Sequence, residues 1–143
     1  MPYSTLNDIL EEIPRSVLVG LADDPENPTG DIVQANIDSA IAKADAIIDG
    51  YIGTRLSLPL AATTPVLTEI SVDLAIYTLF SRVSSVPEFR EKRFKGSMAF
   101  LIRFQEGKGN IGSVALPEGA TPAQLPLFSS VEKEFSEETW SKF

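Results

Sequence analysis

The residues of this sequence that could perform chemistry are carboxylates, hydroxyls and cations. Its 143 residues include 20 Asp and Glu and 12 Lys and Arg, but no cysteine and no histidine. Without thiolates and imidazoles, disulfides, most zinc sites and every histidine-activated nucleophile are excluded. We therefore expect no catalytic residue, no cofactor and no metal ion, and interpret the chain as structural. An enzyme using an Asp or Glu pair as acid and base is the alternative, although no particular pair stands out.

An acidic loop is the best candidate for a metal site. The segment ADDPENPTG, residues 22–30, has two prolines and a glycine, as expected for a loop. Its oxygen-bearing side chains and those beside it are Asp23, Asp24, Glu26, Asn27 and Asp31. The alternating ligands and central glycine of an EF-hand loop are not in register. We expect a solvated turn that caps the next helix, with calcium binding as the minor alternative.

Cations gather in residues 88–108. The basic residues in the first part of this segment and near its end are Arg90, Lys92, Arg93, Lys95 and Arg103. One interpretation is a contact with DNA, because clustered Lys and Arg bind phosphates. The other is pairing with acidic residues, within the chain or on a neighbouring copy; the candidate partners are Glu12, Asp38, Asp45 and Asp49. The net charge of −8 favours the second.

Two long helices are predicted to form the body of the protein. Over residues 31–52, apolar residues recur at three- and four-residue spacing, with Asp31 suited to the N-cap and Gly53 to a left-handed residue after the helix. Residues 65–83 are apolar around most of the helix circumference, and Thr64 followed by Pro65 suits a helix start. We expect this second helix to be the central one.

Three further helices complete the predicted fold. Residues 6–13 form a short helix capped by Ser4 or Thr5 and ended by Pro14, and residues 15–21 form another turn or two. In the basic helix, Ser85 and Glu88 have capping-box spacing, with Pro87 in the first turn. We predict an all-α fold: a small antiparallel helical bundle in residues 1–109 and an extended C-terminal arm in residues 110–143.

The arm has several prolines and glycines and no sustained hydrophobic period. It nevertheless carries four aromatic residues, Phe128, Phe135, Trp140 and Phe143. Because the segment has no core of its own, these side chains need a surface against which to be buried, and aromatic residues are favoured interface anchors. We predict that they anchor the arm on another subunit.

The most distinctive string of the sequence is DGYIGTRLSLPL, residues 49–60. Its proposed structural residues are Asp49, Gly50, Tyr51, Gly53, Arg55 and Pro59. A glycine that ends a helix, followed by an arginine that meets the exposed carbonyls, explains the string without a ligand. A ligand-binding loop is the alternative, and Arg55 could also pair with a carboxylate of another copy.

Four segments resemble the small head-tail connector proteins of Mu-like phages and prophages, which are related to the head-completion adaptors of other tailed phages. The matching segments are YSTLNDIL, AIIDGYIGTRLSLPL, ISVDLAIYTLFSR and EFSEETWSKF. The resemblance implies an all-α virion protein that forms a ring of about twelve copies between the portal vertex and the tail. The implied partners are copies of itself, the portal protein, a tail terminator or stopper, and passing double-stranded DNA without specific binding.

Charge and location fit this expectation. An acidic lumen would let DNA pass without sticking, because like charges repel. The start MPYSTLNDIL lacks the pattern of a secretory signal, and no apolar run approaches the roughly 20 residues of a membrane span. We expect no membrane contact, assembly in the host cytoplasm and a place in the virion. The alternative function is a small phage DNA-packaging or regulatory protein that binds nucleic acid through the basic helix.

Overall fold

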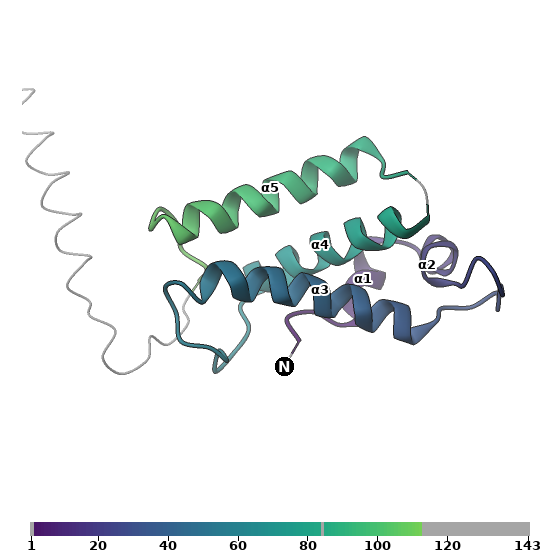
Figure 1. Cartoon of the computed structure of the whole chain (residues 1–143), viewed down its shortest axis with the longest axis horizontal. Coiled ribbons are helices and arrows are strands. Elements are labelled where there is room, and N and C mark those ends of the chain that lie inside the picture. The colour runs from purple at the N-terminus through teal and green to yellow at the C-terminus, as the bar shows by residue number, and fades with distance from the viewer. Residues whose placement is uncertain (1, 84, 113–143) are drawn as a thin grey trace, which may run out of the picture.

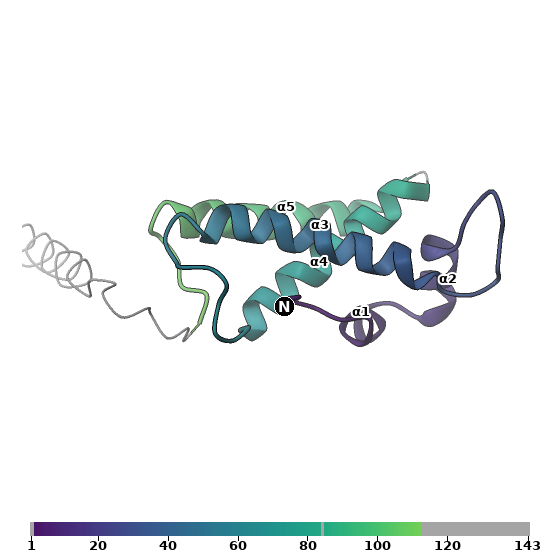
Figure 2. The ribbon, with the colours of Figure 1, turned by 60° about the horizontal axis from the view of Figure 1, so that its bottom comes forward.

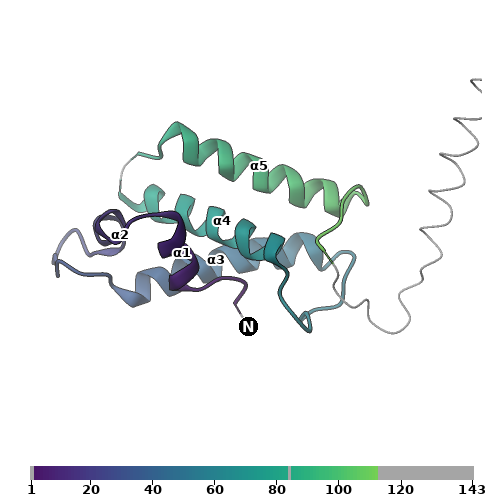
Figure 3. The ribbon, with the colours of Figure 1, turned by 180° about the vertical axis from the view of Figure 1, so that it is seen from behind.

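The computed structural model describes residues 2–83 and 85–112, in which five helices and no strands are present. The helices are α1 (Leu6–Glu12), α2 (Arg15–Ala22), α3 (Gln34–Ile52), α4 (Pro65–Val83) and α5 (Glu88–Gln105). Figure 1 shows α3, α4 and α5 running in alternating directions, and Figure 3 shows the short α1 and α2 from behind, against α3 and α4. The predicted all-α bundle is confirmed. Most of the predicted arm lies outside the described residues.

Helix α4 is the centre of the bundle, as its composition predicted. It packs against each of the other four helices. Its buried residues are Leu67, Ile70, Ser71, Val72, Leu74, Ala75, Ile76 and Leu79. A helix that is apolar on nearly all sides is stable only when other elements remove those sides from water, and α1, α2, α3 and α5 do so here.

Two predicted helix starts are confirmed. The Thr5 hydroxyl accepts a hydrogen bond from the Asp8 N–H at 3.4 Å, and the Asp8 carboxylate accepts one from the Thr5 N–H at 2.7 Å, which completes a capping box. At α4, the Thr64 hydroxyl accepts from the Leu67 N–H at 3.4 Å. Both caps use side chains within three residues of the groups they satisfy, so local sequence was enough to predict them.

Two other predicted caps are wrong. Helix α3 begins at Gln34, and its N-cap, Val33, makes no side-chain cap. The Asp31 carboxylate instead pairs with Arg15 at 2.8 Å, which holds it away from the helix end. Helix α5 begins after Pro87, which is the extended N-cap and not part of the first turn, and no side chain caps it. Glu88 pairs with Lys92 at 3.1 Å, so its carboxylate does not reach back toward Ser85.

Gly53 ends α3, but not through a left-handed conformation. Its φ of −62° and ψ of −16° are right-handed, and its N–H donates to the Asp49 carbonyl at 2.9 Å. The prediction of a left-handed glycine is therefore wrong. Glycine suits this position because a Cβ atom would lie 2.7 Å from that carbonyl oxygen and 3.1 Å from Cδ1 of Leu58. Close approach of the chain, and not a positive φ, favours glycine here.

Candidate functional site

A groove runs between the N-terminal segment, residues 2–6, and α3. Figure 2 shows this segment below α3, leading into α1. The groove has a volume of about 620 Å³. Its lining residues are Pro2, Ser4, Thr5, Leu6, Gln34, Asp38, Ile41, Ala42, Asp45, Ala46 and Asp49. The charged side chains among them are three aspartates on α3, at positions 38, 45 and 49, so the groove combines an acidic wall with small and apolar residues.

Tyr3 fastens the N-terminal segment to this wall. Its hydroxyl donates a hydrogen bond to Asp49, and its N–H donates to Asp45 at 3.2 Å. Its carbonyl accepts from the Thr68 hydroxyl of α4 at 2.9 Å. Burial and the hydrogen bond to Asp49 raise the pKa of the Tyr3 phenol well above its usual value of about 10. The phenol therefore keeps its proton and acts as a donor.

A buried chain of hydroxyls continues from the same wall into the core. Ser71 of α4 donates to Asp45 at 2.9 Å, and Ser4 lies 2.7 Å from the Ser71 oxygen. Because the Ser71 proton is used on Asp45, Ser4 must be the donor in the second bond. Burial raises the pKa of the Asp45 carboxyl, and the hydrogen bonds from Ser71 and Tyr3 oppose that shift. These groups are satisfied by one another, and the network holds the N-terminal segment to α3 and α4.

In the basic helix α5, Arg93 pairs with carboxylates of the same chain. Arg93 Nε lies 2.8 Å from Asp73, and its other nitrogens lie 3.7 Å from Glu12 and from Glu69. Burial acts to lower the pKa of Arg93, but the hydrogen bond and charge of Asp73 together with the charges of Glu12 and Glu69 outweigh it, and the pKa is raised. The pairing of α5 with carboxylates is thus confirmed, with partners inside the same chain.

Of the four candidate carboxylate partners, Glu12 alone pairs with α5 within the described part of the chain. Glu12 lies 3.6 Å from Arg90 as well as near Arg93. Asp45 and Asp49 bind the N-terminal segment, as described above, and Asp38 accepts from Gln34 at 2.8 Å on its own helix. The partners that were missed, Glu69 and Asp73, lie on α4. Their charges stand out on an otherwise apolar helix, a signal that could have indicated a buried or half-buried ion pair.

In the distinctive string, residues 49–60, Arg55 was predicted to meet the carbonyls at the end of α3, but it contacts the end of another helix. Its Nη1 donates to the Phe104 carbonyl at 3.1 Å, and its guanidinium lies 5.1 Å from the centre of the Phe104 ring. It therefore caps the C-terminal end of α5 and not that of α3. Gly107, with a φ of +87°, turns the chain beside this guanidinium. Cations are favourable at this end because the last carbonyls lack helical partners.

The other residues of the string have simpler surroundings. Asp49 accepts from Tyr3, and the Tyr51 carbonyl accepts from the Thr54 hydroxyl at 2.8 Å. A Cβ atom at Gly50 would meet nothing within 4 Å. Pro59 is exposed and follows a cis peptide bond from Leu58. Two residues of the string, Asp49 and Arg55, thus contact other segments of the chain.

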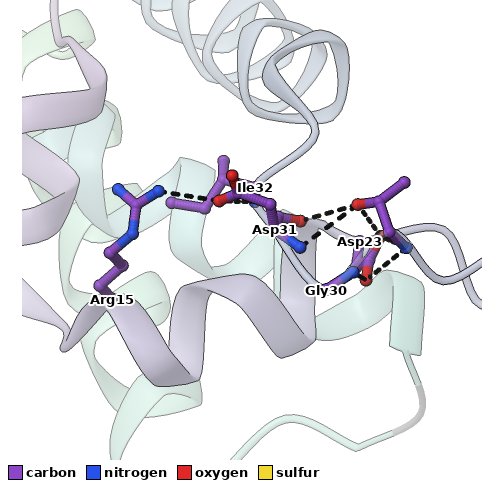
Figure 4. A network of polar contacts seen from close by, with 6 residues as sticks. Arg15, Asp23, Gly30, Asp31 and Ile32 are labelled. Carbon is purple, nitrogen blue, oxygen red and sulfur yellow. Dashed lines mark hydrogen bonds and ion pairs between the residues drawn. The ribbon is translucent and has the colours of Figure 1, made fainter.

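The acidic loop is organised by Asp23. Its carboxylate accepts from the Thr29 hydroxyl at 2.8 Å and from the backbone N–H groups of Thr29, Gly30 and Asp24, at distances between 2.8 and 3.0 Å. These bonds, those from Thr29 first, lower its pKa to about 2. Figure 4 shows this loop beside the Arg15–Asp31 pair. The Asp23 oxygens are used to close the loop, as expected for a solvated turn.

Two other expectations concern membrane-spanning helices and the C-terminal arm. Within the described residues, none of the helices has the length and apolar character needed to span a bilayer. The predicted arm anchors Phe128, Phe135, Trp140 and Phe143 lie outside the described residues.

Fold and groove together define a small all-α protein whose polar network joins its N-terminal segment to a central helix. The family described as Bacteriophage Mu, Gp36 matches residues 3–129, and the chain belongs to that family of phage proteins. Gene product J of Escherichia phage Mu is similar to it: the two are 29% identical over 143 residues, covering 94% of this chain and 99% of that protein. The resemblance to proteins of Mu-like phages is therefore confirmed.

Proposed function

We propose that this protein is a structural subunit of the phage particle, a head-tail connector that forms a ring through which DNA passes. Membership of a phage Mu family supports a role in the particle. One observation favours a connector over a DNA-binding protein: Arg93 of α5 binds Asp73 of the same chain, and the protein has a net charge of −8. A protein that pairs Arg90 and Arg93 of its basic helix internally and stays acidic suits a wall that DNA passes, because it offers little attraction to phosphates.

In this proposal the protein performs no covalent step. One face of the ring contacts the portal protein and the other receives a tail terminator or stopper. The lumen carries double-stranded DNA without specific binding. The protein is assembled in the host cytoplasm and stays in the virion, and its arm anchors on a neighbouring subunit through the four aromatic residues named above.

A second candidate is a DNA-packaging or regulatory protein that binds nucleic acid. The observation in its favour is the exposure of Lys92, Lys95 and Arg103 on α5, where the two lysines pair, among the described residues, with glutamates of their own helix. Three phosphate contacts would give binding that falls with salt at a slope of about −2.7 in a double-logarithmic plot. Retention of the purified protein on duplex DNA with such a slope would favour this candidate.

The test is a set of phage particles made without the protein. A connector predicts full heads that leak DNA and carry no tails, restored by supplying the protein from a plasmid. Electron micrographs of thin sections and purified particles give the answer. Tailed, infectious particles would overturn the proposal. Heads that never fill would instead favour the packaging candidate.

A further inference from the structure

The groove is long, because its lining residues extend along α3 from Gln34 to Asp49. Asp38 and Asp49 are 11 residues apart on one helix, with Asp45 between them, and residues seven and eleven apart share a helix face. At 1.5 Å per residue they mark out roughly 16 Å of the groove. Ala42 and Ala46, both exposed, leave room between the carboxylates for the side chains of another helix.

The outer face of α5 has the complementary pattern. Every charged residue between positions 92 and 105 is positive, and Lys92 and Arg103 are also 11 residues apart. The exposed residues of this face are Glu88, Phe89, Lys92, Lys95, Gly96, Ala99, Ile102 and Arg103. Phe89 and Ile102 are 59% and 40% exposed, although they are apolar. From position 92 to 103 the face is thus cationic, with small residues in the middle, apolar residues near both ends and one carboxylate, Glu88, at its start.

The two surfaces lie on opposite sides of the molecule. In Figures 1 and 3, α5 forms one edge of the bundle and the N-terminal segment beside the groove lies at the other. A subunit therefore cannot place its own α5 in its own groove, but a second copy can. Contacts between two unlike surfaces run head to tail, and they close into a ring when the rotation between copies allows it.

We propose that the outer face of α5 of one copy docks in the α3 groove of the next copy. Lys92 and Arg103 then face the aspartates at the two ends of the groove, and Phe89 and Ile102 are removed from water. The pairs that Lys92 and Lys95 make with Glu88 and Glu91 do not prevent this, because all four side chains are about half exposed or more, and such pairs are weak. The inference rests on the ring of the proposed function and identifies the surfaces that form it.

Cysteine cross-linking tests the contact directly, because the chain has no cysteine of its own. One double variant carries Asp38→Cys and Arg103→Cys, and a second carries Asp38→Cys and Lys92→Cys. We expect one of them, oxidised in solution or in particles, to give a ladder of covalent multimers on a denaturing gel, and the successful pair reports the relative direction of the helices. The control, Lys43→Cys with Arg103→Cys, uses an exposed α3 residue that does not line the groove.

Charge reversal gives a second test that does not depend on cross-linking. Asp38→Lys disables the groove and Arg103→Glu disables the α5 face, so each is expected to raise the concentration needed for self-association by about tenfold or more. Mixing the two variants leaves one contact intact, between the groove of Arg103→Glu and the α5 face of Asp38→Lys, so the mixture should associate at lower concentrations than either variant alone. The second contact pairs Lys with Glu if Asp38 faces Arg103, which gives longer multimers, and is repulsive if Asp38 faces Lys92, which stops association at dimers. Glu26→Lys and Lys43→Glu, which make matching charge changes away from both surfaces, should associate like wild type.

The outcomes separate this inference from the function on which it rests. If no ladder forms in particles whose connector role is shown by the missing-protein experiment, the interface is elsewhere and the connector proposal stands. A ladder only from the control pair would also overturn the docking inference. If particles without the protein are tailed and infectious, the connector proposal fails, whereas a ladder in solution would still support the contact.

Discussion

At the scale of single residues, polar side chains connect segments that are far apart in the sequence. Arg55 reaches the end of α5, and Tyr3 joins the start of the chain to α3 and α4. Each of these contacts combines a hydrogen bond with burial or with a charge. Such bonds contribute more than a neutral surface hydrogen bond, because a lost partner leaves a group unsatisfied in a half-buried place.

Arg55 gives the first prediction. Arg55→Ala should lower the free energy of unfolding by about 1–2 kcal/mol, because the bond to the Phe104 carbonyl and the contact with the Phe104 ring are lost. Arg55→Lys should recover only part of this, since lysine lacks the flat guanidinium that can bond and stack together. Urea unfolding measures both. Arg103→Lys, at an exposed position of α5, is the control, and wild-type stability of both Arg55 variants would make position 55 ordinary surface.

Asp45 gives a pH prediction. Burial raises its pKa in the folded state, so folding favours the protonated form. Its contribution to stability is therefore complete below the ordinary Asp value of about 3.9 and is lost as the pH rises through the raised value. Relative to wild type, Asp45→Asn should gain stability between acid and neutral pH. Unfolding in urea at several pH values tests this, with Asp38→Asn as control; a difference that does not change with pH would contradict it.

At the scale of elements, α4 carries the fold. It buries eight residues among the other helices, and Tyr77 stacks on Phe94 of α5 with ring centres 3.9 Å apart. Ion pairs between α5 and α4 lie beside this stack. The bundle therefore depends on α4 more than on any single polar contact, because each buried side chain removes apolar surface from water.

Core truncation on α4 gives the third prediction. Leu74 is 1% exposed, so Leu74→Ala should cost about 2–5 kcal/mol of the free energy of unfolding. Phe80 is only partly buried, and Phe80→Ala should cost less than a fully buried phenylalanine would. Val83→Ala, at a residue that is 47% exposed, should change stability by roughly 0.5 kcal/mol or less. A loss below about 1 kcal/mol at Leu74 in urea unfolding would mean that α4 is peripheral.

At the scale of the whole molecule, the described residues share one apolar core. The cluster of buried apolar residues extends from Tyr3 to Ile111 and includes members from every helix. The groove and the face of α5 lie at the edges of this cluster, on opposite sides of the bundle, and Ile41 belongs both to the cluster and to the lining of the groove. The surfaces available for assembly thus lie at the periphery of the core.

The arm gives the last prediction. Deleting the chain after Gly119 should leave helical circular dichroism and the melting temperature nearly unchanged, because the core described above lies before that point. The same deletion should abolish incorporation into particles if the arm aromatics anchor it on another subunit. In the full chain, Trp140 is the only tryptophan, and its emission should shift to the blue on assembly. Unfolding of the truncated subunit would place the arm in the core, and normal incorporation would remove its anchoring role.

Local patterns of the sequence were enough to predict the five helices and the central place of α4. The three- and four-residue spacing predicted α3, and the apolar circumference predicted that α4 is central, because both depend only on which sides of a helix avoid water. The caps at Thr5 and Thr64 were also predicted, since each bonds a group three residues away. The phage family followed from strings of residues spread over most of the chain.

Only the tertiary structure decided which polar groups meet. Arg55 and Phe104 are 49 residues apart, Tyr3 and Asp49 are 46 apart, and Arg93 and Asp73 are 20 apart. Periodicity shows which face a residue occupies on its own helix, but not which helix lies opposite that face. The same reason applies to the groove, because its two walls come from the N-terminal segment and α3, which meet only when the chain has folded around α4.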